Sequence, residues 1–359
     1  MALPLVTESS IKGSKAENQD AVFQFASPSQ HVHVLAVFDG HGVNGKLAAD
    51  TARDVLANFL HHLPQIDRIP AERWGYNLAH LFQTMEHEIR AKFLQHVPGS
   101  YNEDGVVRKR DGTYVGGGTT ATIIVSSQTA NGSRFLVRAN VGDSDAYLVS
   151  NTGQLLPLFV SHKATDPNEA ARFRGMNVEL VYSGAAVGNQ PIYDHQGNVR
   201  DPTRLGVPGS NARMEPGTYV EHKIQPDKFA LAMTRSLGDF YSKPFGVLCE
   251  PSVDVVLLNE NVKDATIVVA SDGVWDSWRY PEFAAQLVAW KNQGIANLAD
   301  TLCRDSVQKS NDLFGPANRD DISAVVFRLP NEVRVFQGTK GSKKCKKSRT
   351  SRTSRKSRK

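Results

Sequence analysis

The most constraining feature of this chain is the way its apolar β-type runs are grouped, with helical segments inserted between the groups in pairs. The runs occupy residues 21–25, 33–38, 120–125, 134–141, 145–150, 229–233, 265–270 and 322–329. Two amphipathic helical patterns lie within residues 43–96, and two more lie beyond residue 280, where Pro281 suits a first helical turn. Because strands and helices do not alternate singly, the pattern predicts an α+β layered sandwich in preference to a doubly wound parallel sheet.

The charge of the chain divides it into a globular body and a basic appendage. Of the 359 residues, 40% are apolar, which is enough to bury a large core without cross-links. Residues 340–359 carry eleven Lys or Arg and no acid, whereas the rest of the chain has 31 basic and 37 acidic residues. We therefore expect one folded body over residues 1–335 and a disordered Lys/Arg/Ser tail over residues 336–359.

Three further observations concern a surface segment, the cysteines and the cellular location of the chain. Residues 163–226 are rich in Gly, Pro and Asn and poor in apolar runs, so we expect a flap-like excursion over the surface beside the functional site. Cys249, Cys303 and Cys345 lie far apart, as expected of free thiols in a reducing compartment. No stretch of eighteen apolar residues occurs, so we expect no membrane span and an intracellular protein, nuclear or cytoplasmic, with a monomer as the default.

Two strand patterns end in the dipeptide Asp-Gly, at Asp39-Gly40 and at Asp272-Gly273. A strand end holds a carboxylate rigidly, and the glycine lets its own carbonyl turn inward as a further oxygen ligand. Other acids flank strands at Asp20, at Asp143 with Asp145, and at Asp320 with Asp321. Asp-Gly between apolar runs is also typical of a hairpin turn, but both dipeptides here are followed by helical patterns instead of a second strand.

A fold that gathers these acids needs a cation, because each close pair of carboxylates repels by about 4 kcal/mol at an effective dielectric near 20. All the candidate ligands are oxygens, which favours Mg²⁺ or Mn²⁺ over zinc or copper. Two such ions bridged by one aspartate can activate a shared water and neutralise a phosphoryl group during in-line attack. The acid pattern therefore indicates phosphoester hydrolysis without a covalent enzyme intermediate.

Seven segments of the chain resemble, in the same order, the type 2C protein phosphatases, the metal-dependent serine/threonine phosphatase family. They are KGSKAENQDA (12–21), VFDGHG (37–42), GGTTATIIV (117–125), NVGDSDAYL (140–148), LAMTRSLGDFYSK (231–243), VVASDGVWD (268–276) and NRDDISAVVF (318–327). The resemblance spans about residues 8–329. It implies a catalytic domain over residues 1–335 built as a four-layer α-β-β-α sandwich, with two antiparallel β-sheets flanked by helix pairs, and phosphoproteins as substrates.

The resemblance also implies roles for individual residues. Asp39 would bridge two Mg²⁺ or Mn²⁺ ions, and the Gly40 carbonyl would bind one of them. Asp272 and Asp320 would bind the other ion, and Asp20 would hold water on the first. Asp143 and Asp276 would form a weaker third position, as in some members. His41 would act as the general acid that protonates the leaving serine or threonine oxygen.

The chain departs from the family pattern at positions expected to contact the substrate. Lys15 stands where animal members place a phosphate-gripping arginine, so phosphate binding is expected to be weaker because lysine lacks the bidentate fork. Gln19 replaces the usual glutamate, and Asp145 stands where arginine is usual. The segment from Ser161 to Ala164 takes the place of the family's Asp-His-Lys-Pro.

Two alternatives to a simple phosphatase stay open from the sequence. An inactive relative could bind phosphoproteins as a regulatory scaffold, although a scaffold has no need to keep three mutually repulsive acids. The basic tail is suited to nonspecific contact with nucleic acid or another polyanion, to nuclear import, or to solubility alone.

Overall fold

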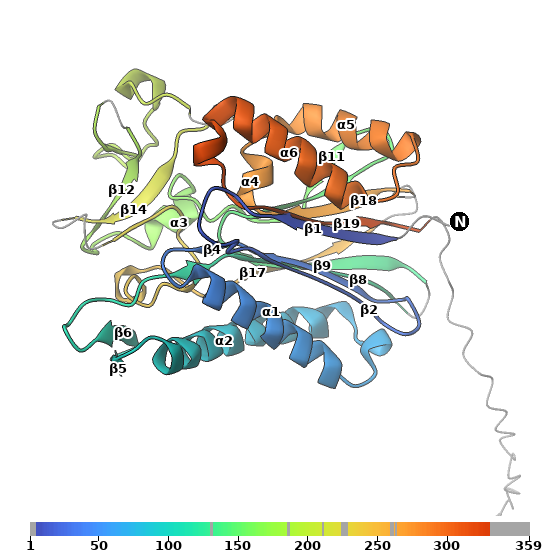
Figure 1. The fold of residues 1–359 in the computed structure, drawn as a ribbon, viewed down its shortest axis with the longest axis horizontal. Helices are drawn as coiled ribbons and strands as arrows, with labels where there is room; N and C mark the ends of the chain where they lie inside the picture. The colour runs from blue at the N-terminus through green and yellow to red at the C-terminus, as the bar shows by residue number, and fades with distance from the viewer. Residues whose placement is uncertain are drawn as a thin grey trace, which may run out of the picture.

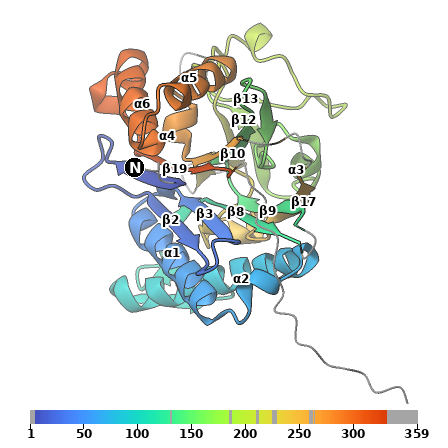
Figure 2. The ribbon, with the colours of Figure 1, turned by 90° about the vertical axis from the view of Figure 1, so that its right-hand side faces the viewer.

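The computed structural model describes residues 5–129, 132–184, 187–209, 212–223, 229–258, 262 and 264–330. Two five-stranded antiparallel sheets lie face to face, and a pair of helices covers the outer face of each, giving four layers (Figure 1). The view at right angles shows the same stacking of helices, sheet, sheet and helices (Figure 2). The predicted α-β-β-α sandwich is therefore confirmed.

The first sheet has the order β1-β19-β18-β10-β11 and the second has the order β17-β9-β8-β3-β2. The first consists of β1 (Val6–Ile11), β19 (Ile322–Arg328), β18 (Thr266–Ala270), β10 (Asp145–Val149) and β11 (Leu155–Pro157). The second consists of β17 (Ser252–Leu257), β9 (Arg134–Val141), β8 (Ala121–Gln128), β3 (His33–Phe38) and β2 (Ala21–Ala26). Helices α5 (Tyr280–Asn292) and α6 (Leu298–Phe314) cover the first sheet, and α1 (Gly45–His62) and α2 (Ala71–His96) cover the second.

The period-two alternation of strand side chains builds the core in layers. On β3, Leu35 and Val37 pack between the two sheets, whereas Val34, Ala36 and Phe38 face the layer of α1 and α2. All five side chains are fully buried. A strand buried on both faces reads as a continuous apolar run, which is why the sequence identified β3 and its neighbours readily.

In the two large sheets, the strands that the sequence analysis missed lie at the edges. β1 and β17 each occupy an edge and contain only half-buried and exposed residues, so their apolar signal is weak. The strand predicted over residues 229–233 is wrong in extent, because only β15 (Ala230–Leu231) pairs, at the edge of a small sheet. Both predicted helix pairs are present, and Pro281 lies in the first turn of α5 as expected.

Residues 163–226, here called the flap, contain structure that the sequence did not predict. The flap carries α3 (Pro167–Ala171), β12 (Val178–Tyr182), β13 (Gln190–Pro191) and β14 (Thr218–His222). These strands form an antiparallel sheet of order β13-β12-β14-β15, which lies beside one end of the sandwich, at the left of Figure 1.

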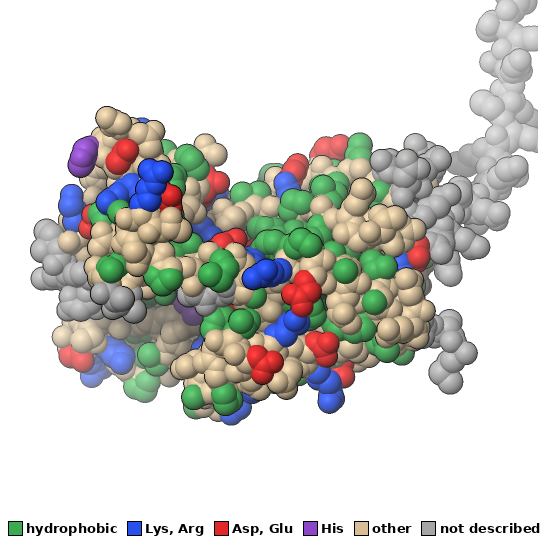
Figure 3. Space-filling model, turned by 90° about the horizontal axis from the view of Figure 1, so that it is seen from above, with side chains coloured by type: hydrophobic (Ala, Val, Ile, Leu, Met, Phe, Trp, Pro, Cys, Tyr) green, Lys and Arg blue, Asp and Glu red, His purple; other side chains and the backbone are tan. Residues whose placement is uncertain are grey.

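Other predictions have the following outcomes. Cys249 and Cys303 are free thiols, whereas Cys345, the predicted domain end at residue 335 and the basic tail lie outside the described residues. Among the helices that the structure describes, none is long and apolar enough to cross a membrane. On the face seen from the α5 and α6 side, acidic and basic side chains are interspersed and do not gather by sign (Figure 3).

Candidate active site

Asp39 follows β3 directly, and its backbone is fixed from both sides by one residue of the neighbouring strand segment. The Asp39 amide donates to Thr120 Oγ1 at 3.1 Å, and the Thr120 amide donates to the Asp39 carbonyl at 2.9 Å. Gly40 comes next, where an added Cβ would lie 2.4 Å from the Gln19 carbonyl oxygen and 2.6 Å from that of Gly45. Only glycine permits this approach, which brings the segment carrying Asp20 beside Asp39.

Asp272 begins the short helix α4 (Asp272–Trp275) directly after β18, and a second glycine sets its surroundings. A Cβ on Gly273 would lie 2.0 Å from the carbonyl oxygen of Asp321, so the start of α4 packs on the backbone that leads into β19. The two Asp-Gly dipeptides therefore serve the same purpose in packing. Each lets another acidic segment approach the end of a buried strand, which brings Asp320 toward Asp272.

A buried carboxylate, that of Asp321, joins the N-terminal acidic segment to this end of the sheet. Its two oxygens accept hydrogen bonds from the amides of Gly13, at 2.7 Å, and of Gln19, at 2.8 Å. Asp20, next in the chain, accepts a hydrogen bond from Ser271 Oγ at 2.9 Å. Asp321 is thus a supporting residue rather than one aimed into the site, a distinction that the adjacent letters Asp320-Asp321 do not reveal.

The acids at the centre of the site raise one another's pKa. Burial, followed by the charges of Asp272, Asp20 and Asp320, holds the pKa of Asp39 well above its usual range. Burial and the charge of Asp320 do the same to Asp272, and a side-chain hydrogen bond joins Asp39 and Asp272. Burial also raises the pKa of Asp20 to about 6. These carboxylates therefore lie close enough to interact strongly.

The donor set fits a hydrated divalent ion. Asp20 Oδ1 and Asp272 Oδ1 are buried and accept no hydrogen bond, which is a costly state for a carboxylate oxygen unless a cation or water occupies the space beside it. Within the described ranges, no group of three His, Cys, Asp or Glu side chains is arranged to hold an ion alone. Mg²⁺ commonly takes one or two carboxylates and keeps several waters, so the two observations are compatible.

Lys15 forms ion pairs with two acids of the site, so its ammonium group already has partners. Its Nζ is 2.7 Å from Asp320 Oδ1 and 4.0 Å from Asp321 Oδ2. Burial acts to lower the pKa of Lys15, but the charge of Asp320 outweighs it and raises the pKa. The pairing therefore neutralises part of the charge of Asp320. Lys15 was predicted from the resemblance as a phosphate ligand, and its position next to Asp320 leaves it at the rim of that acidic centre.

His41 is held by a partner that the sequence analysis did not single out. A small three-stranded sheet places β4 (Gly40–His41) beside β7 (Gly118–Thr119), and β7 beside β16 (Leu237–Gly238). Asp239 follows β16, and its Oδ2 lies 2.7 Å from His41 Nε2. Burial acts to lower the pKa of His41, but Asp239 outweighs it and raises the pKa.

Asp239 is itself completely buried and strongly supported. It accepts a hydrogen bond from Ser236 Oγ at 2.7 Å and one from Tyr241 at 3.2 Å. Burial acts to raise its pKa, but His41, Lys243 and Ser236 lower it below the usual range. Glu86 of α2 fixes the same loop by accepting from the Gly238 amide at 2.8 Å. The carboxylate is therefore placed to orient the imidazole of His41 and to favour its charged form.

The remaining predicted ligands line a cavity of about 200 Å³ between the flap and the sandwich. Asp143, Asp272 and Asp276 line it together with Lys163 and Arg213. Asp276 does not point freely into this space, because Arg213 Nη2 lies 3.0 Å from its Oδ1.

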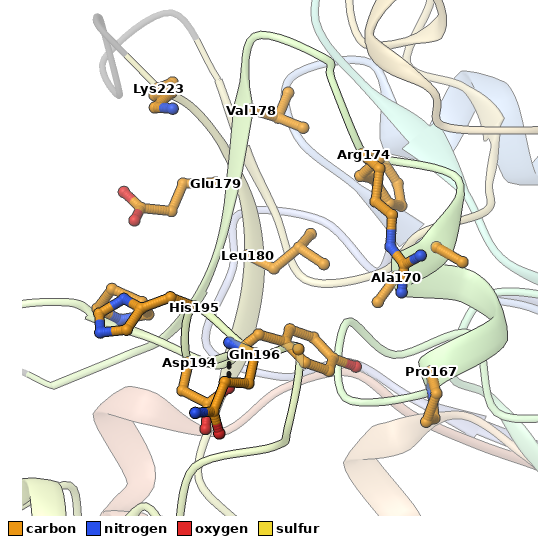
Figure 4. A pocket seen from close by; sticks show the side chains of 15 residues that line it. Pro167, Ala170, Arg174, Val178, Glu179, Leu180, Asp194, His195, Gln196 and Lys223 are labelled. Atoms are coloured by element: carbon orange, nitrogen blue, oxygen red, sulfur yellow. Dashed lines mark hydrogen bonds between the residues drawn. The ribbon is translucent and has the colours of Figure 1, made fainter.

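A larger cavity of about 500 Å³ lies within the flap, among α3, β12 and the turn at residues 194–197 (Figure 4). Arg174 lies on one side of it, with Asp194 and His195 on the other. This cavity contains none of the seven predicted metal ligands. Three of those ligands, Asp143, Asp272 and Asp276, line the smaller cavity instead.

The comparisons with known proteins agree with this fold. The family model for protein phosphatase 2C matches residues 6–311, and the chain belongs to the protein phosphatase 2C family. A probable protein phosphatase 2C 24 of Arabidopsis thaliana is 28% identical over 75% of this chain and 60% of its own length. A probable protein phosphatase 2C 61 of the same plant is 27% identical over 89% and 83%. The chain spans only about three fifths of the length of several such relatives.

Solved structures of the same fold cover nearly the whole described body. A serine-threonine phosphatase 2C from Toxoplasma gondii has a TM-score of 0.62 at 15% identity, covering 90% of this chain and 94% of that one. The catalytic domain of the phosphatase PstP, in complex with two manganese ions, has a TM-score of 0.50 at 17% identity, covering 90% and 97%. At these identities the likeness concerns the fold.

Proposed function

We propose that the chain is a Mg²⁺- or Mn²⁺-dependent protein phosphatase that hydrolyses phosphoserine and phosphothreonine. The carrying observation is the pair of buried, unpartnered carboxylate oxygens, on Asp20 and Asp272, within a cluster of acids whose pKa values are raised by their neighbours. Membership of the protein phosphatase 2C family supports the reaction class. An inactive scaffold is disfavoured, because mutually repulsive buried acids lower the stability of the fold and bring no benefit to a protein that only binds.

The residues present suit two ions. Asp39 and the Gly40 carbonyl, with Asp272, would hold them, Asp20 would act through bound water, and Asp320 would join when it leaves Lys15. Bound there, two divalent ions lower the pKa of a shared water and neutralise phosphoryl oxygens during in-line attack, so no covalent enzyme intermediate is required.

The proton for the leaving group comes from the protein itself. Asp239 binds Nε2 of His41, so Nδ1 is the nitrogen left to donate to the departing serine or threonine oxygen. Because Asp239 raises the pKa of His41, the donor stays protonated over a wider pH range. The His41–Asp239 pair therefore acts as an oriented general acid beside the acidic centre.

The test is Mn²⁺-stimulated release of phosphate from a phosphopeptide by the full chain and by Asp272→Asn. The variant should lose activity by on the order of 100-fold or more. Asp54→Asn, a matched change at an exposed carboxylate on α1, should keep wild-type activity. A manganese-loaded wild type that releases no phosphate would leave only the scaffold.

A second measurement separates metal binding from general damage to the fold. Without metal, Asp272→Asn should be more stable than the wild type, because one of the mutually repulsive carboxylates is gone. Manganese at about 100 times its dissociation constant should stabilise the wild type by about 2.7 kcal/mol and the variant much less. A variant that is less stable than the wild type in chelator would mean that Asp272 is structural.

We also propose, from the sequence, that the protein works inside the cell, in the nucleus or the cytoplasm, and that its tail contacts polyanions. The support is the run of eleven Lys or Arg without acids at residues 340–359, a segment outside the described residues. The mixed charge on the face shown in Figure 3 offers no comparable basic patch there. Nonspecific contact with nucleic acid would therefore depend on the tail and not on that face.

A further inference from the structure

Arg213 of the flap reaches the position where a third ion is expected from the resemblance. Its Nη2 lies 3.0 Å from Asp276 Oδ1, and its Nη1 lies 3.3 Å from Asp145 Oδ2. The guanidinium also donates to the hydroxyl of Tyr280 and packs over its ring. The side chain of Arg213 is only 7% exposed, so this is a buried charge with partners on two carboxylates and a phenol.

Asp145 explains why an arginine from the flap is needed there. Its carboxylate is 5% exposed, on β10 of the first sheet, and accepts a hydrogen bond from Tyr280 at 3.0 Å. The family pattern has an arginine at this position of the strand, whereas here the strand supplies the acid and the flap supplies the guanidinium. A cation is therefore still present beside Asp276, although the flap and not the strand supplies it.

A third divalent ion does not fit this arrangement. Of the two predicted ligands, Asp143 and Asp276, the second already bonds to a guanidinium that stays charged at every accessible pH. A divalent ion between them would lie against the positive charge of Arg213, and Lys163 also lines the cavity. Both cations would oppose the binding of that ion.

The residue that precedes Arg213 also bonds the flap to the sandwich. The amide of Ala212 donates to the Asp276 carbonyl at 3.0 Å, and Arg279 Nε donates to the Ala212 carbonyl at 3.3 Å. Two consecutive flap residues thus bind the region where α4 ends and α5 begins. Arg213 would therefore hold the flap at the mouth of the acidic cavity as well as neutralise it.

We propose that Arg213 takes the place of the third metal ion, so that this chain binds two divalent ions and closes its flap with a protein cation. The inference rests on the proposed two-ion function and goes beyond it by assigning a positioning role to Arg213. It implies that flap closure in this protein does not depend on metal concentration.

The test counts manganese ions bound by the full chain, using electron paramagnetic resonance of free Mn²⁺ during titration. The wild type should bind two ions. Arg213→Met should bind a third, weaker ion, and Arg213→Lys, which keeps the charge, should bind two. Arg204→Met removes another flap arginine, one that is 87% exposed, and should also bind two.

Hydrogen exchange gives a readout that is independent of metal and of activity. Amides in residues 212–219 should exchange faster in Arg213→Met than in the wild type or Arg204→Met, because the bond from the Ala212 amide to Asp276 would open more often. If Arg213→Met fails to fold, the double variant Asp145→Asn with Arg213→Met removes the buried pair together and keeps Asp143 and Asp276. It should gain the third ion.

The outcomes separate this inference from the function beneath it. Three ions bound to the wild type would overturn the inference. Two ions bound to each folded variant without a cation at residue 213 would also overturn it. Neither result would contradict the phosphatase function. A wild type that binds no manganese would overturn the metal-dependent function and the inference together.

Discussion

Replacing Glu169 with glutamine should weaken the attachment of the flap in a way that depends on pH. Glu169 lies on α3, is 6% exposed, and is surrounded by donors from the flap and the sandwich. Its carboxylate accepts from Arg235 at 2.6 Å, from Arg172 at 2.5 Å and from Thr234 at 2.7 Å. Burial acts to raise the pKa of Glu169, but these three donors outweigh it and lower the pKa to about 2.

The size of the effect follows from that pKa. A fall from the ordinary 4.5 to about 2 corresponds to about 3.4 kcal/mol of stability at neutral pH, at about 1.36 kcal/mol per pKa unit. The partners Arg172 and Arg235 are 23% and 17% exposed, so solvent screening reduces this to about 2–3 kcal/mol. Because the pKa of an acid is lowered on folding, this stability is present above pH 4.5 and is lost as the pH falls toward 2.

Urea unfolding in chelator, at pH 7 and at pH 3.5, measures the prediction directly. Glu169→Gln should be about 2–3 kcal/mol less stable than the wild type at pH 7, and the gap should narrow by about 1 kcal/mol at pH 3.5. Glu282→Gln, an exposed carboxylate paired with Lys309, should change stability by less than about 0.5 kcal/mol. A gap of the same size at both pH values would refute the reasoning, because the charge of Glu169 would then not be its source.

Three further predictions concern the general acid, a buried histidine and the tail. Asp239→Asn should lower the pKa of His41 and shift the alkaline limb of the pH–rate profile to lower pH; an unmoved limb would exclude this pair as the general acid. Burial lowers the pKa of His162 to about 3, so in urea unfolding the wild type should lose about 2 kcal/mol more stability between pH 7 and 5 than His162→Gln does. Deleting residues 338–359 should leave turnover of a small phosphate ester unchanged and abolish salt-sensitive retention on DNA, and parallel loss of both would contradict a separate tail.

The sequence predicted those parts of the fold whose side chains repeat with a strong period. β3 and β18 are buried on both faces and read as apolar runs, and the helix pairs show clear amphipathic spacing. The flap strands β12 and β14 gave no such signal, because they lie in a segment rich in Gly, Pro and Asn. Their small apolar clusters join side chains from separate parts of the flap and from residues just beyond it, which a local pattern does not show.

The acids of the site were also accessible from the sequence, but their supporting partners were not. Asp39 and Asp272 stand out because each directly follows an apolar run and precedes a glycine. Asp239 has a comparable neighbour, Gly238, and lies in a segment that carried the family resemblance, yet its partner His41 is 198 positions away. Only the three-stranded sheet of β4, β7 and β16 brings the two together, so the pairing is a property of the tertiary fold.

Asp145, which stands where the family pattern has arginine, shows why one position in the sequence can give a wrong picture of the charge of the folded site. Read locally, an acid in place of arginine removes a cation and puts substrate contacts in doubt. In the fold, Arg213, which is 68 positions away, restores a cation beside Asp145 and Asp276. Breaking a buried pair of this kind by removing one partner typically costs about 3–5 kcal/mol, so Asp145 and Arg213 are expected to be exchangeable only together. The unit that determines the charge of this cavity is therefore the strand–flap pair and not either residue alone.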